Sequence, residues 1–211
     1  GTLSYTPAPD ANGTATITVT VTDDGNTDGG VGDDNSYSIS FDVEVTPVND
    51  KPISDNQSLI AIEDIEKSIT LTGSDGDPEL TQTLTYILTA LPSTGTLSES
   101  GNGSVILIGD LPLTLSNSTI YFTTALNDVD QQTFDFKVRD NGNANAGIGD
   151  DNESSDATVT VTITPVNDKP IIDLVDDPDA ILEDAFEQTI NLTGIGDGDP
   201  ELAQVLDVIA T

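Results

Sequence analysis

Side chains able to bind a metal ion gather in a hexapeptide that this chain contains twice, first as Pro47-Val48-Asn49-Asp50-Lys51-Pro52 and again at 165–170. In each copy an Asn and an Asp provide an amide oxygen, a carboxylate and backbone carbonyls at one point of the chain. Calcium prefers a ligand set made only of such oxygens. The two prolines fix φ and push the residues before them into extended geometry, which makes a stiff, non-helical connector. A linker that binds a metal ion is therefore the first hypothesis.

Two further acidic motifs recur together with the linker. The pair Glu63-Asp64 returns as Glu183-Asp184, and the turn Asp75-Gly76-Asp77-Pro78-Glu79-Leu80 returns residue for residue at 197–202. The linker itself recurs after 118 residues, from Asn49 to Asn167, which is the size of a small domain and not of a solenoid unit. The chain is therefore predicted to hold the closing part of one repeat, a complete repeat and the opening part of a third, at 1–52, 53–170 and 171–211.

Alternation of apolar and polar residues predicts β-strands throughout the repeat. The clearest strands are those with long alternating runs, at 14–22, 37–45, 134–138 and 157–163. Shorter strands are expected at 59–62, 68–73, 83–91, 94–98, 104–108 and 120–122. Tyr37 and Tyr86 fall at positions expected to face the core. About seven or eight short strands per repeat predict an all-β fold of tandem Greek-key β-sandwiches, with one complete copy flanked by two partial copies.

The composition restricts the possible partners. Five Lys and Arg residues against 38 Asp and Glu residues leave a formal net charge of −33 at pH 7. This charge excludes nucleic acid as an ordinary partner and disfavours an anionic membrane surface. So much like charge opposes the compact state unless counter-ions neutralise it, and cations are the expected remedy. No apolar run approaches the roughly 18 residues of a membrane span, so we expect no membrane insertion in this segment.

The absence of His and Cys removes most enzyme mechanisms from consideration. Ser-His and Cys-His pairs and His-bound or thiolate-bound zinc sites cannot form without these residues. Paired carboxylates could in principle cleave glycosidic bonds. The acids of this chain, however, recur with the repeat and occur in turns, which fits a structural ion better than one asymmetric catalytic cleft. We therefore expect a protein that is not an enzyme.

With its linkers, its Glu-Asp pairs and its Asp-Gly-Asp turns, the chain resembles the cadherin-like tandem repeats of large bacterial adhesins and other secreted surface proteins. The resemblance covers the whole chain and implies immunoglobulin-like sandwiches joined end to end, with calcium at the junctions. The metal ligands that it implies are the linker residues Asn49, Asp50, Asn167 and Asp168, the strand-end acids Glu63, Asp64, Glu183 and Asp184, and the turn residues Asp75, Asp77, Asp197 and Asp199.

The sequence departs from the animal cadherin pattern at several positions. Pro47 and Pro165 stand where the leading Asp of that linker would be. Between the Asp and the closing proline each copy has a single residue, Lys51 or Lys169. The Asp-Arg-Glu motif is also missing. We therefore expect one or two ions at each junction and not a cluster of three.

Each acidic motif also has a purely structural interpretation. Asp-Gly and Asn-Asp sequences are common in β-turns, where they supply positive φ and local hydrogen bonds. Three acidic elements that recur around two linkers favour calcium over this interpretation. For the hairpin loops at 23–35 and 140–152 both interpretations stay open, and Asp140 is the candidate ligand there. These loops do not fit the ligand spacing of an EF-hand.

The sequence therefore predicts a calcium-rigidified structural or adhesive segment of a secreted or surface-anchored bacterial protein, such as an adhesin or a surface fibre. Its partners would be the neighbouring repeats of the same chain, and homotypic head-to-tail assembly by strand addition is a further possibility. The alternative is a carbohydrate-binding or protein-binding β-sandwich module of a secreted protein. Carbohydrate platforms usually need exposed aromatic residues, and this chain has no Trp and only four Tyr.

Overall fold

The computed structural model describes residues 1–23, 36–142 and 152–210. The chain forms two compact units. The first unit consists of Gly1–Ile53, Ser74–Leu84 and Arg139–Ser154, and the second consists of Ser54–Gly73, Thr85–Val138 and Ser155–Thr211. Within the described ranges, no helix has the length and apolar character needed to cross a membrane.

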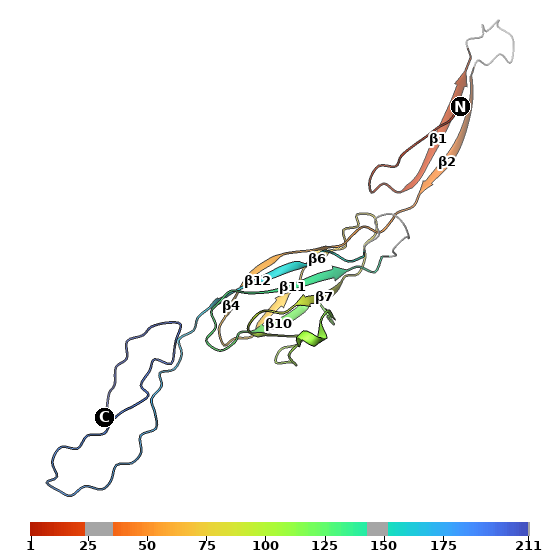
Figure 1. The fold of residues 1–211 in the computed structure, drawn as a ribbon. Helices are drawn as coiled ribbons and strands as arrows, with labels where there is room; N and C mark the ends of the chain where they lie inside the picture. Colours follow the sequence, from red (N-terminus) through yellow and green to blue (C-terminus); the bar gives the residue numbers. More distant parts are fainter. Residues whose placement is uncertain (24–35, 143–151, 211) are drawn as a thin grey trace. The chain divides into compact units, whose positions relative to one another are not determined.

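A long β-hairpin is the main element of the first unit (Figure 1). β1 (Gly13–Thr22) and β2 (Ser36–Val45) pair antiparallel in an unbroken register from Gly13 opposite Val45 to Thr22 opposite Ser36. Hydroxyl and carboxylate groups pair across the polar face, for example Thr16 with Asp42 at 2.6 Å. The strict two-residue alternation predicted both strands, because successive side chains of a strand point to opposite faces.

The apolar face of this hairpin stays largely exposed. The side chain of Tyr37 is 72% exposed, and those of Ile39 and Phe41 are 52% and 42% exposed. The core position predicted for Tyr37 is therefore wrong. β1 and β2 form a two-stranded sheet, and in the part of the chain that the structure describes no second sheet covers it.

A β-sandwich occupies the second unit, where the two principal sheets share one core. The larger sheet has the strand order β4 (Gln57–Ile62), β12 (Ala157–Thr164), β11 (Gln132–Arg139), β7 (Thr85–Ala90) and β9 (Leu113–Thr114). The smaller sheet has the order β5 (Lys67–Thr70), β10 (Thr119–Thr123) and β8 (Thr96–Ser98). A short ladder joins β3 (Ile53–Ser54) to β6 (Gly73–Ser74). Figure 1 shows β4, β12, β11 and β7 side by side.

The core of the sandwich comes from both sheets. Ile120 and Phe122 on β10 are fully buried, as are Phe136 and Val138 on β11. Tyr86 packs against this core at partial exposure, with its ring centroid 6.3 Å from that of Phe136. The all-β class and the sandwich are therefore confirmed, while the number of repeats and their boundaries stay predictions.

The structure differs from the strand prediction in three short parts of the chain. The strand expected at 104–108 is wrong, because Val105 forms only a single bridge with Ser98 and a 3₁₀ turn, η1 (Ile108–Asp110), follows. The Asp110 carboxylate accepts a hydrogen bond from the Leu107 N–H at 2.8 Å, which closes that turn. The strand β9 was not predicted, because two residues are too few to show alternation. The described residues 171–210 form one isolated β-bridge, between Ile171 and Gly196, and no strand.

We expect Phe136→Ala to lower the free energy of unfolding by about 3 to 5 kcal/mol, because the ring is fully buried and the substitution leaves a cavity. Chemical denaturation followed by far-ultraviolet circular dichroism would measure the loss. Phe41→Ala is the matched control, since Phe41 lies on the exposed hairpin and should change the unfolding of the sandwich little. A loss below about 1 kcal/mol for Phe136→Ala would contradict the assigned core.

Candidate metal centre

Three carboxylates converge where the first linker meets the Asp-Gly-Asp turn of the first unit. One oxygen from each of Asp50, Asp77 and Glu79 lies within 4.8 Å of the others. Gly76 makes this approach possible, because its φ is +74° and a Cβ there would collide with the Lys51 carbonyl. Only glycine adopts this φ without strain while letting another backbone approach so closely. The predicted convergence of linker and turn is present in the structure.

Hydrogen bonds hold the two Asp side chains of this turn in fixed orientations. Asp77 Oδ1 accepts the backbone N–H groups of Glu79 and Leu80, both at 2.9 Å. Gln82 donates its backbone N–H to Asp75 Oδ2 and its side-chain amide to Asp77 Oδ2, both at 2.8 Å. The carboxylates are therefore oriented by the chain itself.

The direction of the pKa shift differs among the three carboxylates of this cluster. Burial acts to raise the pKa of Asp77, but hydrogen bonds from Leu80 and Glu79 outweigh it and hold that pKa below its ordinary value. Burial and the negative charges of Asp10 and Asp77 raise the pKa of Asp50. Burial, a hydrogen bond with Asp77 and the charges of Asp77 and Asp10 combine to raise the pKa of Glu79. A cation at this place would relieve the repulsion.

Buried oxygens without hydrogen-bond donors lie beside the carboxylates. Asn49 is 5% exposed, and its amide nitrogen donates to Asp140 Oδ2 at 3.3 Å and to the Asp50 carbonyl at 3.1 Å. Its Oδ1 atom has no partner in the described structure, and neither do Gln82 Oε1 and Glu79 Oε2. Unpartnered buried acceptors are costly in a folded protein. Carboxylate and amide oxygens of this kind are the ligands that calcium prefers, so the residues present fit calcium.

The second linker repeats this arrangement within the second unit. Asp199 Oδ1 accepts the Leu202 N–H at 2.9 Å, and Asp199 Oδ2 accepts the Gln204 side-chain amide at 2.6 Å. The Asp168 N–H also donates to Asp199 Oδ2, at 3.4 Å. A Cβ on Gly198 (φ +76°) would collide with the Lys169 carbonyl, as one on Gly76 would with Lys51. Linker and turn therefore meet in the same way in both units.

Unpartnered oxygens recur at the second linker as well. Both carboxylate oxygens of Glu201 and Glu63 Oε1 are buried without a donor in the described structure. Burial raises the pKa of Glu201, and the negative charges of Glu63 and Asp199 raise it further. Negative charge therefore gathers at the second linker as well.

The two strand-end acids Glu63 and Asp64 have different surroundings in the structure. Glu63 Oε2 accepts the Val166 N–H of the second linker at 3.3 Å. β4 runs parallel to β12, and the last residue of β4, Ile62, pairs with the last residue of β12, Thr164. Glu63 therefore lies next to the start of the second linker. Asp64 has a φ of +60°, and its N–H donates to Thr124 Oγ1 at 3.3 Å.

The remaining predicted ligands occupy different surroundings. Asp140 is buried beside Asn49, Asp197 accepts the Gln204 N–H at 3.3 Å, and Asn167, Glu183 and Asp184 are exposed. Asp184 repeats the positive φ of Asp64. The rest of the two hairpin loops lies mostly outside the described residues. The metal-ligand role of each predicted residue stays a prediction.

Sequence reasoning did not single out five residues that lie at the two linkers. They are Asp10, Glu79, Gln82, Glu201 and Gln204. The repeat itself carried the signal for four of them, because Glu79 and Gln82 return as Glu201 and Gln204 at the same spacing from the Asp-Gly-Asp turn. Asp10 has no acidic counterpart in the next repeat, because the corresponding residue is Asn127. The two residues share a left-handed backbone conformation, with φ of +56° at Asp10 and +55° at Asn127.

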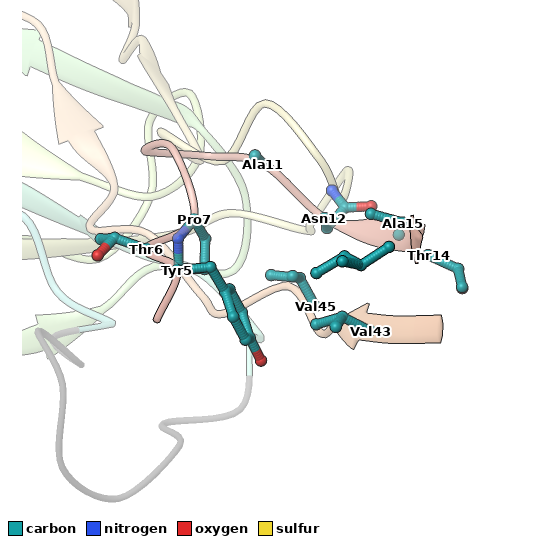
Figure 2. Close-up of a pocket in the computed structure, with 11 residues that line it drawn as sticks. Tyr5, Thr6, Pro7, Ala11, Asn12, Thr14, Ala15, Val43 and Val45 are labelled. Carbon is teal, nitrogen blue, oxygen red and sulfur yellow. The ribbon is translucent and has the colours of Figure 1, made fainter. Parts of the chain in front are cut away.

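An apolar pocket beside the hairpin is assigned to packing and not to ligand binding. Figure 2 shows Tyr5 and Pro7 of the N-terminal segment together with Val43 and Val45 of β2. Tyr5 corresponds in the repeat to Phe122, which is fully buried in the sandwich core. The pocket therefore lies where a complete repeat places core side chains.

The chain is similar in fold to solved cadherin ectodomains at low sequence identity. No family model and no curated protein matches it. It is similar to protocadherin gamma B7 extracellular cadherin domains 1–4, with 18% identity and a TM-score of 0.45, over 88% of this chain and 41% of that one. It is also similar to mouse cadherin-23 EC22–24, with 21% identity and a TM-score of 0.39, over 74% of this chain and 44% of that one. The chain spans less than half the length of either structure.

We expect Gly142→Ala to weaken calcium binding at the first linker, because the added methyl group would overlap Asn49 Oδ1 and crowd Gln82 Oε1. Isothermal titration calorimetry would show fewer or weaker sites than in the wild type. Gly109→Ala is the matched control, since nothing lies within 4 Å of its added methyl group. Equal calcium binding by both variants and the wild type would contradict this site.

We expect Glu79→Gln to raise the melting temperature of the ion-free protein at about pH 7, with the gain vanishing near pH 4. The folded-state pKa of Glu79 lies above its ordinary value of 4.5. The protonated Glu79 side chain therefore favours the folded state: this contribution to the free energy of unfolding is fully present below pH 4.5 and is lost as the pH rises through the raised pKa. Thermal melts in chelator at both pH values measure the difference, with the exposed Glu44→Gln as control. A gain of the same size at both pH values would contradict the assignment.

Proposed function

We propose that this chain is a calcium-rigidified structural or adhesive repeat segment of an extracellular bacterial adhesin or surface fibre. One observation carries the proposal. At both linkers, an Asp-Gly-Asp turn is held against the linker backbone, and buried oxygens without donors gather beside it. The arrangement recurs in two separate units, so a local accident of packing is a poor explanation for it.

The chemistry of the donor set supports calcium over other metals. The candidate ligands are carboxylate and amide oxygens, and the chain contains no His or Cys for zinc, copper or iron. Magnesium usually keeps several of its waters and binds through only one or two carboxylates. A site with three carboxylates and a buried amide oxygen suits the larger, less demanding coordination shell of calcium.

Calcium binding would stiffen the linkers. The candidate ligands of each linker come from the linker itself and from the turn that packs on it, so an ion that binds both would fix the direction of the chain between them. The ion would also neutralise part of the formal charge of −33. The segment would then serve to space or connect functional domains at a cell surface. Neighbouring repeats would be its partners, and homotypic head-to-tail assembly stays a prediction.

We expect millimolar calcium to raise the melting temperature of the 211-residue chain and a chelator to lower it, because the ion binds the folded linkers and not the unfolded chain. Half of the effect should fall at roughly 10⁻⁴ to 10⁻³ M calcium, as in other extracellular modules. Small-angle scattering in the same buffers would test the stiffening, and magnesium is the control ion.

The double variant Asp77→Asn, Asp199→Asn supplies the second control. It removes one carboxylate from each linker and should abolish most of the calcium response. Identical wild-type melting curves in chelator and in calcium would refute the proposed function.

A further inference from the structure

A glutamine side chain bridges the acidic turn and the linker in each unit. Gln82 donates to both Asp residues of the first turn, through its backbone N–H to Asp75 and its side-chain amide to Asp77. These two bonds leave one polar atom of the side chain, Oε1, without a donor. The free atom is an oxygen, and it belongs to the same amide group whose nitrogen donates to Asp77 of the candidate metal centre.

Gln82 Oε1 shares a hollow with Asn49 Oδ1. Both oxygens face Gly142, where a Cβ would overlap Asn49 Oδ1 and lie 2.5 Å from Gln82 Oε1. Asn49 is more than nine-tenths buried, and its Oδ1 accepts no hydrogen bond in the described structure. The hollow has a volume of about 340 Å³, and Pro47, Leu80, Thr81 and Asn141 complete its lining. Two amide oxygens that face one space without a donor form a place for a cation.

The second unit repeats the bonding of this glutamine. Gln204 donates its backbone N–H to Asp197 at 3.3 Å and its side-chain amide to Asp199 at 2.6 Å. A turn that needed only a structural brace could use any donor at this position. The same pair of bonds in two units indicates that a donor at this position orients the second Asp of each turn.

We propose that Gln82 is a metal-binding and positioning residue of the first linker, and that Gln204 positions Asp199 in the same way at the second. This inference rests on the calcium binding proposed above. The amide nitrogen holds the Asp77 carboxylate in place, and Oε1 supplies a neutral ligand to the ion. A neutral oxygen adds a ligand without adding to the repulsion among Asp50, Asp77 and Glu79, which is already evident in the raised pKa values of two of them.

Two substitutions separate the roles of the two amide atoms. Gln82→Met removes both atoms at similar size, so it should weaken calcium binding at the first linker by about 10- to 100-fold, as losses of orienting partners at metal sites do. Gln82→Glu keeps an oxygen near the place of Oε1 but loses the donor to Asp77. It should therefore lower the melting temperature in chelator and increase the upward shift that calcium produces.

Calorimetric titration with calcium chloride and thermal melts in chelator and in calcium provide the readouts. In Gln82→Met the isotherm should separate into a weakened class and an unchanged class of sites, because Gln204 still serves the second linker. Gln204→Met should weaken the other class, and the double variant should weaken both. Gln57→Met is the matched control, since Gln57 also donates to one acceptor, the Thr70 carbonyl at 2.9 Å, and leaves its Oε1 unpartnered in the described structure, away from the linkers.

The outcomes distinguish this inference from the proposed function. A wild-type protein that does not respond to calcium overturns both. A wild-type response that Gln82→Met and Gln204→Met leave unchanged overturns this inference alone, because a merely structural glutamine would lower both melting curves equally, as Gln57→Met should. A calcium-induced shift for Gln82→Glu that falls as far as that for Gln82→Met removes the ligand role of Oε1 and also overturns it.

Discussion

Repulsion between carboxylates held against each linker is the constraint on which the rest of this structure depends. Asp50, Asp77 and Glu79 meet within 4.8 Å in a chain that carries a formal charge of −33. The fold does not separate them. It fixes the Asp77 carboxylate with backbone hydrogen bonds and leaves neighbouring oxygens without donors. A positive charge bound at this place would offset the repulsion, so the linker geometry and the proposed calcium binding are linked.

The sequence predicted the long elements and missed the short ones for a physical reason. β1, β2, β11 and β12 alternate over eight or more residues, and a period of two is visible without knowledge of the partner strand. β9 has two residues, and the expected strand at 104–108 reduces to one bridge. Pairing of such short segments depends on neighbours that are distant in sequence, which a local pattern does not contain.

The candidate site shows the same division between local and distant information. Contact between linker and turn was predictable, because oxygen-rich motifs repeated together around both linkers. The place of Glu63 was not, since it follows from the parallel register of β4 and β12 and assigns that residue to the second linker. Gln82 could not be singled out from the sequence, because its side chain is neutral and its contacts with Asp75 and Asp77 are hydrogen bonds that only the folded turn makes.

Two glycines explain why the arrangement can recur without similar surroundings. Gly76 and Gly198 adopt nearly the same positive φ, and each lets the carbonyl of a linker lysine approach closer than any side chain would permit. This contact involves backbone atoms and requires only the glycine, so it forms equally beside a packed sandwich and beside a segment with few strands. The ligand groups then follow from residues at fixed distances along the chain from that glycine. The contact between linker and turn is therefore encoded within these short motifs and does not depend on the sandwich core.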